Sequence, residues 1–440
     1  MTLLGRVKGF VDHAEAYAIH RKLVHVRCRE SALELTAHRK TSVGALRVLV
    51  DGKLGSSYGE SPDEPELLQD AREAASFGQK ADFVFAPSQT YADASCYDHE
   101  CAELTAGDLI DTCMDLCQRV TQMDADARAN IVCEAESGRR RIETTEGATA
   151  DQQFSHASLF VELPFVSRQA DVGATAHVVS IYPLHVSDAW LEGLLEMRAW
   201  GAGSSVPASG RLPVLLTPQV SHLLTLTLAE CLSSRHVAAG VSPLGEKIDS
   251  AILSEMITVE ENPLHADLPL RRSFDDEGVA VEPRTIVDRG TLRGFAADLA
   301  GGAELGIVST GNAVRRTLFS QRIENAPIPC WLGAIVAPGR TAWRTMMAGI
   351  EEGILVTRML GLHSSNLLQG QFSAQVNGFH IRKGVPVGYL ERTMISGNVF
   401  EEFAHVRAVS REREPTAQGP MAVAGLAPYI LLDAVQVTSG

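Results

Sequence analysis

The sequence predicts an α+β protein of two domains: an N-terminal mixed sheet with helices, then a strand-rich C-terminal domain with a few helices. Three observations support this class. Polar and apolar residues alternate over the first fifty residues, as they do in half-buried strands. Helical spacing is confined to a few separate segments. Small residues with a single proline gather at 201–210, which is typical of a connecting segment. We therefore expect domains at 1–205 and 206–440.

The N-terminal half carries local signals for a hairpin and for helices. Residues 43–50 and 53–58 alternate on either side of Asp51-Gly52, a pair that favours a tight hairpin turn. Pro65 is placed to open a helix that runs through Ala75. The other predicted elements are a helix at about 108–123, strands at 131–136 and 141–145 around a turn at Ser137-Gly138, strands at 157–163 and 175–181, and a helix from Ser187-Asp188 towards Arg198.

The C-terminal half begins with a predicted strand at 212–217. Pro218 then opens a helix whose wide apolar face reaches Cys231. After Gly240 short strands and turns dominate. In this region we predict a hairpin at 286–294, a helix at 341–350 and two strands within 370–384.

The charge balance argues against a nucleic-acid partner. The chain has 39 Lys and Arg against 54 Asp and Glu, a net charge of −15. Such a protein repels polyanions on average, whereas nucleic-acid affinity depends on neutralising phosphates. Three basic clusters are too small and too scattered in the sequence to reverse this expectation; they are Arg139–Arg141, Arg271–Arg272 and Arg315–Arg316.

The sequence also predicts a cytoplasmic protein without a membrane anchor. The N-terminus has no apolar stretch of signal-peptide length. The longest weakly apolar run, 421–432, is interrupted by Gly425 and Pro428, whereas a spanning helix needs about 20 apolar residues. The eight cysteines include no CxxC pair, and Cys113 and Cys117 lie on the apolar stripe of a predicted helix. We therefore expect buried reduced thiols.

Two polar segments of the C-terminal half are candidates for chemistry. Asp275, Asp276 and Glu277 form the densest acidic cluster, which suits a cation or a peptide amine. The adjacent Gly278 equally suits a solvated turn before a strand, and the spacing alone favours that turn. Residues 309–316 end in paired arginines, which either grip a carboxylate through parallel hydrogen bonds or belong to a surface loop. No HExxH motif and no phosphate-binding glycine loop occurs, so these motifs alone identify no function.

Taken in order, the motifs of the second half resemble the TldD/PmbA family. The matching segments are Gly245-Glu246, Asn262-Pro263, Phe274–Gly278, Gly290–Leu292, Gly306, Ser309–Asn312, Pro338-Gly339, Glu352–Ile354, Gly370–Ser373, Gly378–Gly384 and Ile395–Gly397. Weaker matches in the first half are Ala14–Tyr17, Val43–Val48 and Gly55. The resemblance covers most of the chain and is specific after Leu244.

The resemblance implies where a zinc site would fall. The TldD-type member of the family is a zinc peptidase with an HExxxH motif on the helix after the first strand of the second domain, and with a later cysteine ligand. Here Leu226 and Cys231 stand in place of the histidines and Thr227 in place of the glutamate. No cysteine occurs within 419–440. The chain thus resembles the TldE-type subunit, which implies no catalytic residue, metal or cofactor on this chain.

The resemblance also implies a function through a partner. We expect a heterodimer with a zinc-bearing TldD-type relative, formed through the second domain, that cleaves unstructured peptides in a shared cavity. Two alternatives stay open: the same heterodimer hydrolyses an amide of a small molecule in a secondary-metabolite pathway, or the chain is a non-enzymatic protein-binding modulator of the gyrase-modulator type. The candidates for contact with substrate or partner are Asp275, Asp276, Glu277, Asn312, Arg315 and Arg316.

Overall fold

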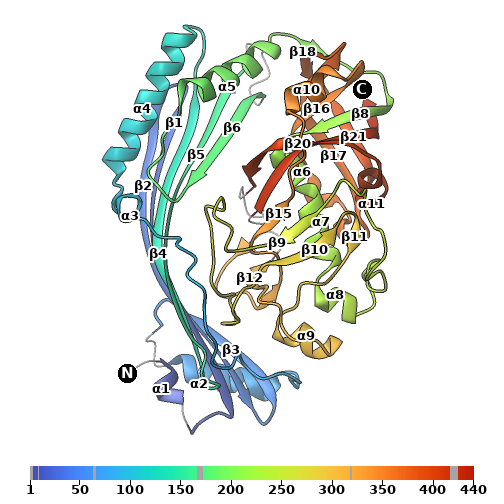
Figure 1. The fold of residues 1–440 in the computed structure, drawn as a ribbon. Helices are drawn as coiled ribbons and strands as arrows, with labels where there is room; N and C mark the ends of the chain where they lie inside the picture. The colour runs from blue at the N-terminus through green and yellow to red at the C-terminus, as the bar shows by residue number, and fades with distance from the viewer. Residues whose placement is uncertain (1–2, 8, 63–65, 166–171, 318–319, 417–424) are drawn as a thin grey trace.

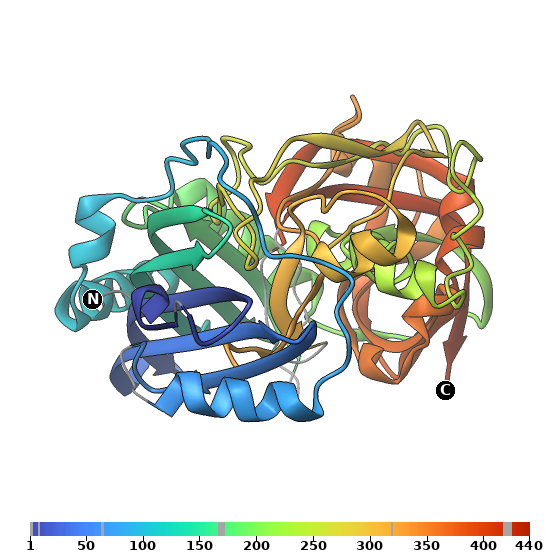
Figure 2. The same cartoon turned by 90° about the horizontal axis from the view of Figure 1, so that it is seen from below.

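The predicted α+β class is confirmed by a computed structural model of the chain. The N-terminal half forms a long curved sheet, and the strand-rich C-terminal half lies on the concave side of that sheet (Figure 1). Figure 2 shows the two halves side by side from below. The structure describes residues 3–7, 9–62, 66–165, 172–317, 320–416 and 425–440.

The N-terminal sheet has six strands in the order β3-β2-β1-β4-β5-β6, and each neighbouring pair is antiparallel. Its strands are β1 (His13–Arg29), β2 (Ala32–Val50), β3 (Lys53–Gly59), β4 (Asn130–Thr144), β5 (Thr149–Pro164) and β6 (Gly173–Ser180). The helices of this half are α1 (Leu3–Val7), α2 (Glu66–Phe77), α3 (His99–Glu103), α4 (Ala106–Met123) and α5 (Asp188–Trp200).

Local sequence signals place several of these elements correctly. Asp51 and Gly52 have φ of 51° and 70° and form the predicted turn between β2 and β3. The side chain of Ser187 accepts a hydrogen bond from the backbone of Trp190 and so caps α5. The predicted helix opener Pro65 lies outside the described residues.

Helix α4 packs its apolar stripe on the sheet and buries a cluster of thiols. Thr105 and Asp108 cap its start reciprocally, which fixes where the helix begins. The Cys113 thiol is hydrogen-bonded to those of Cys28 on β1 and Cys133 on β4, and burial raises the pKa of Cys28 to about 11. All eight cysteines of the chain are free and buried.

The predicted turn at Ser137-Gly138 is wrong, because β4 runs straight through it. Gly138 lies opposite Arg21 of β1 and Phe154 of β5. A Cβ atom at this position would stand 2.2 Å from the backbone oxygen of His20, so the glycine is required by close approach of a neighbouring strand rather than by a bend. The chain turns later, at Gly147, where φ is 103°.

Among the described residues the C-terminal half forms a twelve-stranded sheet and a three-stranded one, the latter in the order β13-β12-β14. The strands are β7 (Ser204–Ser205), β8 (Gly210–Leu216), β9 (Val259–Glu261), β10 (Arg284–Asp288), β11 (Thr291–Leu292), β12 (Ala313–Thr317), β13 (Ser320–Gln321), β14 (Pro327–Pro329), β15 (Ala334–Val336), β16 (Glu352–Leu360), β17 (Gln371–Arg382), β18 (Val385–Leu390), β19 (Thr393–Asn398), β20 (Val406–Pro415) and β21 (Gly425–Ser439). The boundary expected between 205 and 206 falls directly after β7, which pairs with β18.

The helices of the C-terminal half are short. They are α6 (Pro218–Ser221), α7 (Leu223–Cys231), α8 (Ser234–Ala238), α9 (Leu299–Leu305), α10 (Trp343–Ala348) and α11 (Val399–Glu402), with 3₁₀ turns η1 (Leu362–Ser364), η2 (Leu367–Gln369) and η3 (Phe403–His405). No helix of the described residues combines the length and apolar character that a membrane crossing requires.

Two predictions in this half are wrong in detail. The helix expected from Pro218 is interrupted at His222 and again after Cys231, where the carbonyl of Leu232 accepts from the backbone of Ala296 and leaves the helical pattern. The two strands expected within 370–384 are the single strand β17. Its Gly378 fits against the backbone of Leu355 at a bulge, so this glycine does not end the strand.

The close approach at Gly138 yields a stability prediction. Gly138→Ala should destabilise the protein by about 1–3 kcal/mol, because the added methyl group forces β1 and β4 apart. Urea unfolding measures this. Gly193→Ala in α5, where an added Cβ meets nothing within 4 Å, is the control and should be neutral or stabilising. Equal stability of the two variants would contradict the proposed role of Gly138.

Candidate functional site

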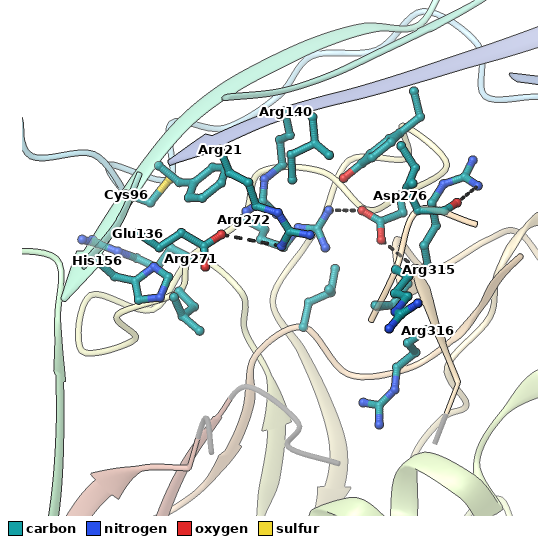
Figure 3. A pocket seen from close by; sticks show the side chains of 18 of the residues that line it. Arg21, Cys96, Glu136, Arg140, His156, Arg271, Arg272, Asp276, Arg315 and Arg316 are labelled. Carbon is teal, nitrogen blue, oxygen red and sulfur yellow. Dashed lines mark hydrogen bonds and ion pairs between the residues drawn. The ribbon is translucent and has the colours of Figure 1, made fainter. Parts of the chain in front are cut away.

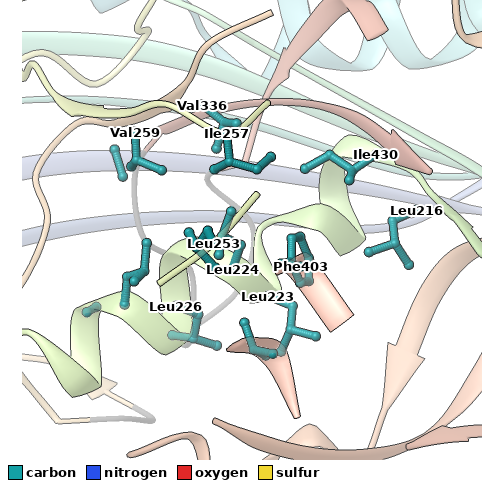
Figure 4. Packing of buried hydrophobic residues seen from close by; sticks show 14 of the residues in the cluster. Leu216, Leu223, Leu224, Leu226, Leu253, Ile257, Val259, Val336, Phe403 and Ile430 are labelled. Carbon is teal, nitrogen blue, oxygen red and sulfur yellow. The ribbon is translucent and has the colours of Figure 1, made fainter. Parts of the chain in front are cut away.

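Helix α7 carries the positions that correspond to the zinc motif, and all three are buried. Leu226, Thr227 and Cys231 are at most 1% exposed. Figure 4 shows the helix among leucine, isoleucine and valine side chains of the C-terminal core. These contacts give α7 the environment of a core helix, in which the side chains stabilise the fold by burial.

These residues do not fit a zinc ion. Zinc requires three or four nitrogen, sulfur or oxygen donors around one point, and the three motif positions of α7 offer one thiol and one hydroxyl. The Cys231 thiol donates to the carbonyl of Leu368 at 3.1 Å, and burial raises its pKa to about 12, so it stays protonated at neutral pH. In the part of the chain that the structure describes, no group of three or more His, Cys, Asp or Glu side chains is placed to hold a metal ion.

A cavity of about 780 Å³ lies beside α7, between the two halves of the molecule. Side chains of β6 and α5 line one wall, and side chains of α6, α7, β16 and β21 line the other. Leu226 of the degenerate motif is part of the second wall. The cavity therefore occupies the place next to the helix where the family's metal motif would stand.

Burial holds several polar groups of this cavity neutral, whereas Arg344 and Arg358 also line it. Burial lowers the pKa of His222 to about 4, helped by the nearby Arg316, and burial lowers that of His177 to about 4 as well. Burial raises the pKa of Glu414, which accepts from Gln219 at 2.9 Å. The Tyr429 ring stacks on that of Trp343 with centroids 4.8 Å apart.

No catalytic dyad involving His222 forms within the described residues. Its Nδ1 is buried without a hydrogen-bond partner, and so is the hydroxyl of Thr217 in the same cavity wall. A histidine that activates a nucleophile lies within hydrogen-bond reach of it, and the base is itself oriented by a third group. Among the described residues His222 is therefore not placed as the base of such a pair.

A second cavity, of about 420 Å³, also lies between the two halves and is strongly basic. Its walls come from β1, β4 and β5 on one side and from loops and β12 of the C-terminal half on the other. Two acidic residues, Glu136 and Asp276, face seven arginines. The arginines are Arg21, Arg140, Arg271, Arg272, Arg315, Arg316 and Arg322. Figure 3 shows Arg140, Arg271 and Arg272 gathered between the sheet and the C-terminal loops.

The acidic cluster at 275–277 is buried, so the predicted solvated turn is wrong. Asp275 and Glu277 are 0% exposed and Asp276 is 5% exposed. Asp275 accepts backbone hydrogen bonds from Glu277, Val279 and Ala313, each at 2.9 Å. Burial and the neighbouring Glu277 raise the pKa of Asp275. This carboxyl group therefore organises the loop around Gly278.

Asp276 and Glu277 connect the loop to arginines on both sides. Asp276 forms an ion pair with Arg272 and accepts a hydrogen bond from the backbone of Arg315 at 2.7 Å. Burial alone would raise the pKa of Asp276, but these partners outweigh it and lower the pKa. Glu277 accepts from Arg47 of β2 at 2.9 Å, although burial still raises its pKa to about 7. The cluster thus joins the C-terminal half to the N-terminal sheet.

The contact with Arg47 is part of a buried ion network across the two halves. Glu15 on β1 lies opposite Arg47 on β2 and accepts from its Nε at 3.0 Å. Glu15 also accepts from Nη2 of Arg315 at 2.9 Å. Glu15 and Glu277 are 0% exposed. Two carboxylates and two guanidinium groups, one of each from either half, therefore meet where all four side chains are buried.

The structure separates the six predicted contact residues into two groups. Asp276, Arg315 and Arg316 line the basic cavity. Asp275 and Glu277 do not line it and are fully buried. Asn312 is also 0% exposed, donates to Glu261 at 3.0 Å and accepts from Arg284. The second group therefore supports the loop that presents the first.

Sequence reasoning missed the arginines that come from other segments. Arg140 belongs to β4, whereas Arg271 and Arg272 lie in the loop before the acidic cluster. The available signal was the set of three small basic clusters, each of which sends at least one arginine into the same cavity. Their convergence depends on how the sheet docks on the C-terminal half, which no local pattern reveals.

Comparison with protein families decides the membership of the chain. The C-terminal domain of PmbA/TldA metallopeptidases matches residues 209–439, more than half of the chain. The chain belongs to the PmbA/TldD family. Domain 1 of the same metallopeptidases matches residues 14–76. The family named from the sequence motifs is therefore confirmed.

The relatives found by sequence comparison are distant. An uncharacterized protein of Methanocaldococcus jannaschii is 22% identical over 81% of this chain and 82% of its own length. A metalloprotease PmbA homologue of Buchnera aphidicola is 26% identical over 48% of this chain and 44% of its own length. A zinc metalloprotease TldD homologue of Saccharolobus solfataricus is 27% identical over 47% of this chain and 46% of its own length.

Solved structures share the fold over the whole chain. TldE from Thermococcus kodakarensis superposes with a TM-score of 0.88 at 21% identity, covering 100% of this chain and 99% of that one. A protein of Thermotoga maritima described as a candidate modulator of DNA gyrase gives 0.85 at 18% identity, covering 99% of this chain and 98% of that one. At such identities the likeness establishes the fold alone.

The buried ion network predicts a large effect of removing Arg47. Arg47→Met should destabilise the protein by about 3–5 kcal/mol, because Glu15 and Glu277 would stay buried without this partner. Urea unfolding at pH 7 measures the loss. Arg139→Met breaks a pair with Asp151 in which the arginine side chain is 57% exposed, and should cost less than about 1 kcal/mol. A loss for Arg47→Met as small as that of this control would contradict the network's role.

The buried imidazole of His222 predicts a loss of stability in acid. Its pKa is about 4 in the folded chain and about 6.5 when exposed, so the unfolded state binds a proton first as the pH falls. Between pH 7 and pH 5 this proton uptake lowers the free energy of unfolding by about 2 kcal/mol. The His222→Gln variant should not show this loss. Unfolding curves at both pH values test this, with the exposed His405→Gln as control for the substitution itself. If His222→Gln keeps the wild-type pH dependence, the imidazole is not the cause.

Proposed function

We propose that this chain is the metal-free subunit of a two-subunit amide hydrolase, paired with a zinc-bearing relative of TldD type that carries out catalysis. The observation that carries the proposal is the burial of Leu226, Thr227 and Cys231 in a core helix that offers no metal site. Membership in a metallopeptidase family, with no metal site among the described residues, is best explained by a partner that holds the metal.

The cavity beside α7 supports a role in holding substrate. Its volume of about 780 Å³ lies within the range of small-molecule sites. Aromatic rings of Trp190, Trp343 and Tyr429 line it together with polar groups, two of which are the arginines Arg344 and Arg358. Such a lining suits the side chains and amides of an unstructured peptide, which we propose as the substrate class. An amide of a small molecule is the alternative that this cavity also accommodates.

The proposal places the complex in the cytoplasm. All eight cysteines are free thiols, although several lie close enough to one another for hydrogen bonds. Thiols at such distances persist unpaired in a reducing compartment. The net charge of −15 further supports a protein that works without a nucleic-acid partner.

Co-expression with a relative that carries an HExxxH motif tests this function. We expect a heterodimer by native mass spectrometry, with one zinc ion per heterodimer and none on this chain alone. The heterodimer should hydrolyse denatured casein, and the pair whose HExxxH glutamate is changed to glutamine should not. A panel of N-acyl amino acid amides distinguishes the small-molecule alternative.

Three results would overturn the proposal. The first is a homodimer of this chain that binds zinc in stoichiometric amount. The second is hydrolysis of casein by this chain alone. The third is a heterodimer that holds zinc but hydrolyses neither peptides nor amides, which would favour the protein-binding modulator.

A further inference from the structure

The lining of the basic cavity is positively charged, although the molecule as a whole is negatively charged. The chain carries a net charge of −15, yet seven arginines and two carboxylates line this cavity. Arginines rarely converge inside a protein unless an anion compensates them, because like charges repel strongly where water is excluded. Burial and repulsion by Arg272 lower the pKa of Arg140, which shows that the guanidinium groups lie close enough to act on each other.

Two of these arginines have no partner that accounts for their position. The side chains of Arg140 and Arg271 form neither an ion pair nor a hydrogen bond with the other described residues, and the Nε atom of each is buried without a partner. The Arg140 guanidinium lies over the Phe154 ring, 4.6 Å from its centroid, and this stacking holds its planar group in place. Both groups therefore present hydrogen-bond donors to the cavity.

Other arginines of the cavity are held by acidic residues. Arg272 is paired with Asp276, and Arg315 with Glu15. Arg21 lies 3.8 Å from Glu136. These pairs fix the walls and leave Arg140 and Arg271 as the donors available to a ligand. A pair of fixed guanidinium groups is suited to oxyanions that accept two parallel hydrogen bonds.

The cavity does not suit a nucleotide base. The Phe154 ring is covered by Arg140, and the Tyr17 ring is covered by Arg315 at 5.2 Å from its centroid. Trp331 is 3% exposed and donates from Nε1 to the carbonyl of Thr225 on α7. The aromatic faces on which a base would stack are therefore already used.

We propose that the basic cavity binds carboxylate groups of an acidic segment in the peptide substrate, with Arg140 and Arg271 as the donors. Only the source of the carboxylate rests on the proposed function. The link through Trp331 and Thr225 places the cavity against α7, so one extended peptide can reach both cavities of the interface between the two halves. The chain would then select substrates that carry Asp or Glu near the scissile amide.

Fluorescence polarisation on this chain alone tests the proposal. The probe is a fluorescein-labelled Gly/Ser peptide with a cluster of glutamates, compared with the same peptide carrying glutamines. We expect the glutamate peptide to bind at least about 10-fold more tightly and to weaken with added salt. Arg140→Gln and Arg271→Gln should each reduce its affinity about 10-fold, since each removes a charge-assisted hydrogen bond.

Arg139→Gln is the matched control. Arg139 precedes Arg140 on β4, so it points to the opposite face of the sheet, where it pairs with Asp151. It should bind the glutamate peptide as the wild type does. Thermal unfolding of each variant shows whether a loss of affinity comes from a loss of folded structure.

Two outcomes would overturn the inference. In the first, both peptides bind equally, or the glutamate peptide binds equally to the wild type and to both arginine variants. In the second, tripolyphosphate binds more tightly than the glutamate peptide and loses affinity in Arg140→Gln, which would assign the cavity to a phosphate ligand. Because the assay needs no partner subunit, its failure leaves the zinc content of the heterodimer as a separate test of the proposed function.

Discussion

The buried ion network between Glu15, Arg47, Glu277 and Arg315 is the constraint on which the rest of the molecule depends. Glu15 and Arg47 already face each other on neighbouring strands, so the N-terminal sheet satisfies this pair before the second half docks. Glu277 and Arg315 then bring the complementary charges. Because each charge is costly to bury without its partner, this network fixes one docking arrangement. That arrangement creates both cavities, since each has one wall from either half.

Helix α7 is a core helix of the C-terminal half. It carries leucine and threonine where the sequence resemblance places a metal ligand and a base, and the side chains around it are largely aliphatic. The cavity beside the helix keeps a volume suited to a ligand, while its histidines are held neutral by burial.

The sequence was informative where the structural cause is local. The turn at Asp51-Gly52 and the helix over 108–123 follow from residues adjacent to them. Gly138 was wrongly predicted to form a turn, because this glycine is required by the close approach of a neighbouring strand. The acidic loop was wrongly predicted to be exposed, because Glu277 binds Arg47, which lies 230 positions away in the sequence. The basic cavity was missed for the same reason: its arginines meet only after the two halves have docked.

The thiol cluster beneath α4 has a consequence for handling the protein. Cys28, Cys113, Cys117 and Cys133 are buried while the helix covers them. Burial raises the pKa of the Cys28, Cys113 and Cys117 thiols, so these hardly form the reactive thiolate. Once α4 lifts away, the thiols of Cys28 and Cys133 on the sheet and those of Cys113 and Cys117 on the helix are all exposed. In air-saturated buffer they would oxidise to mispaired disulfides and trap the unfolded chain. Reversible unfolding of this protein therefore requires a reductant throughout.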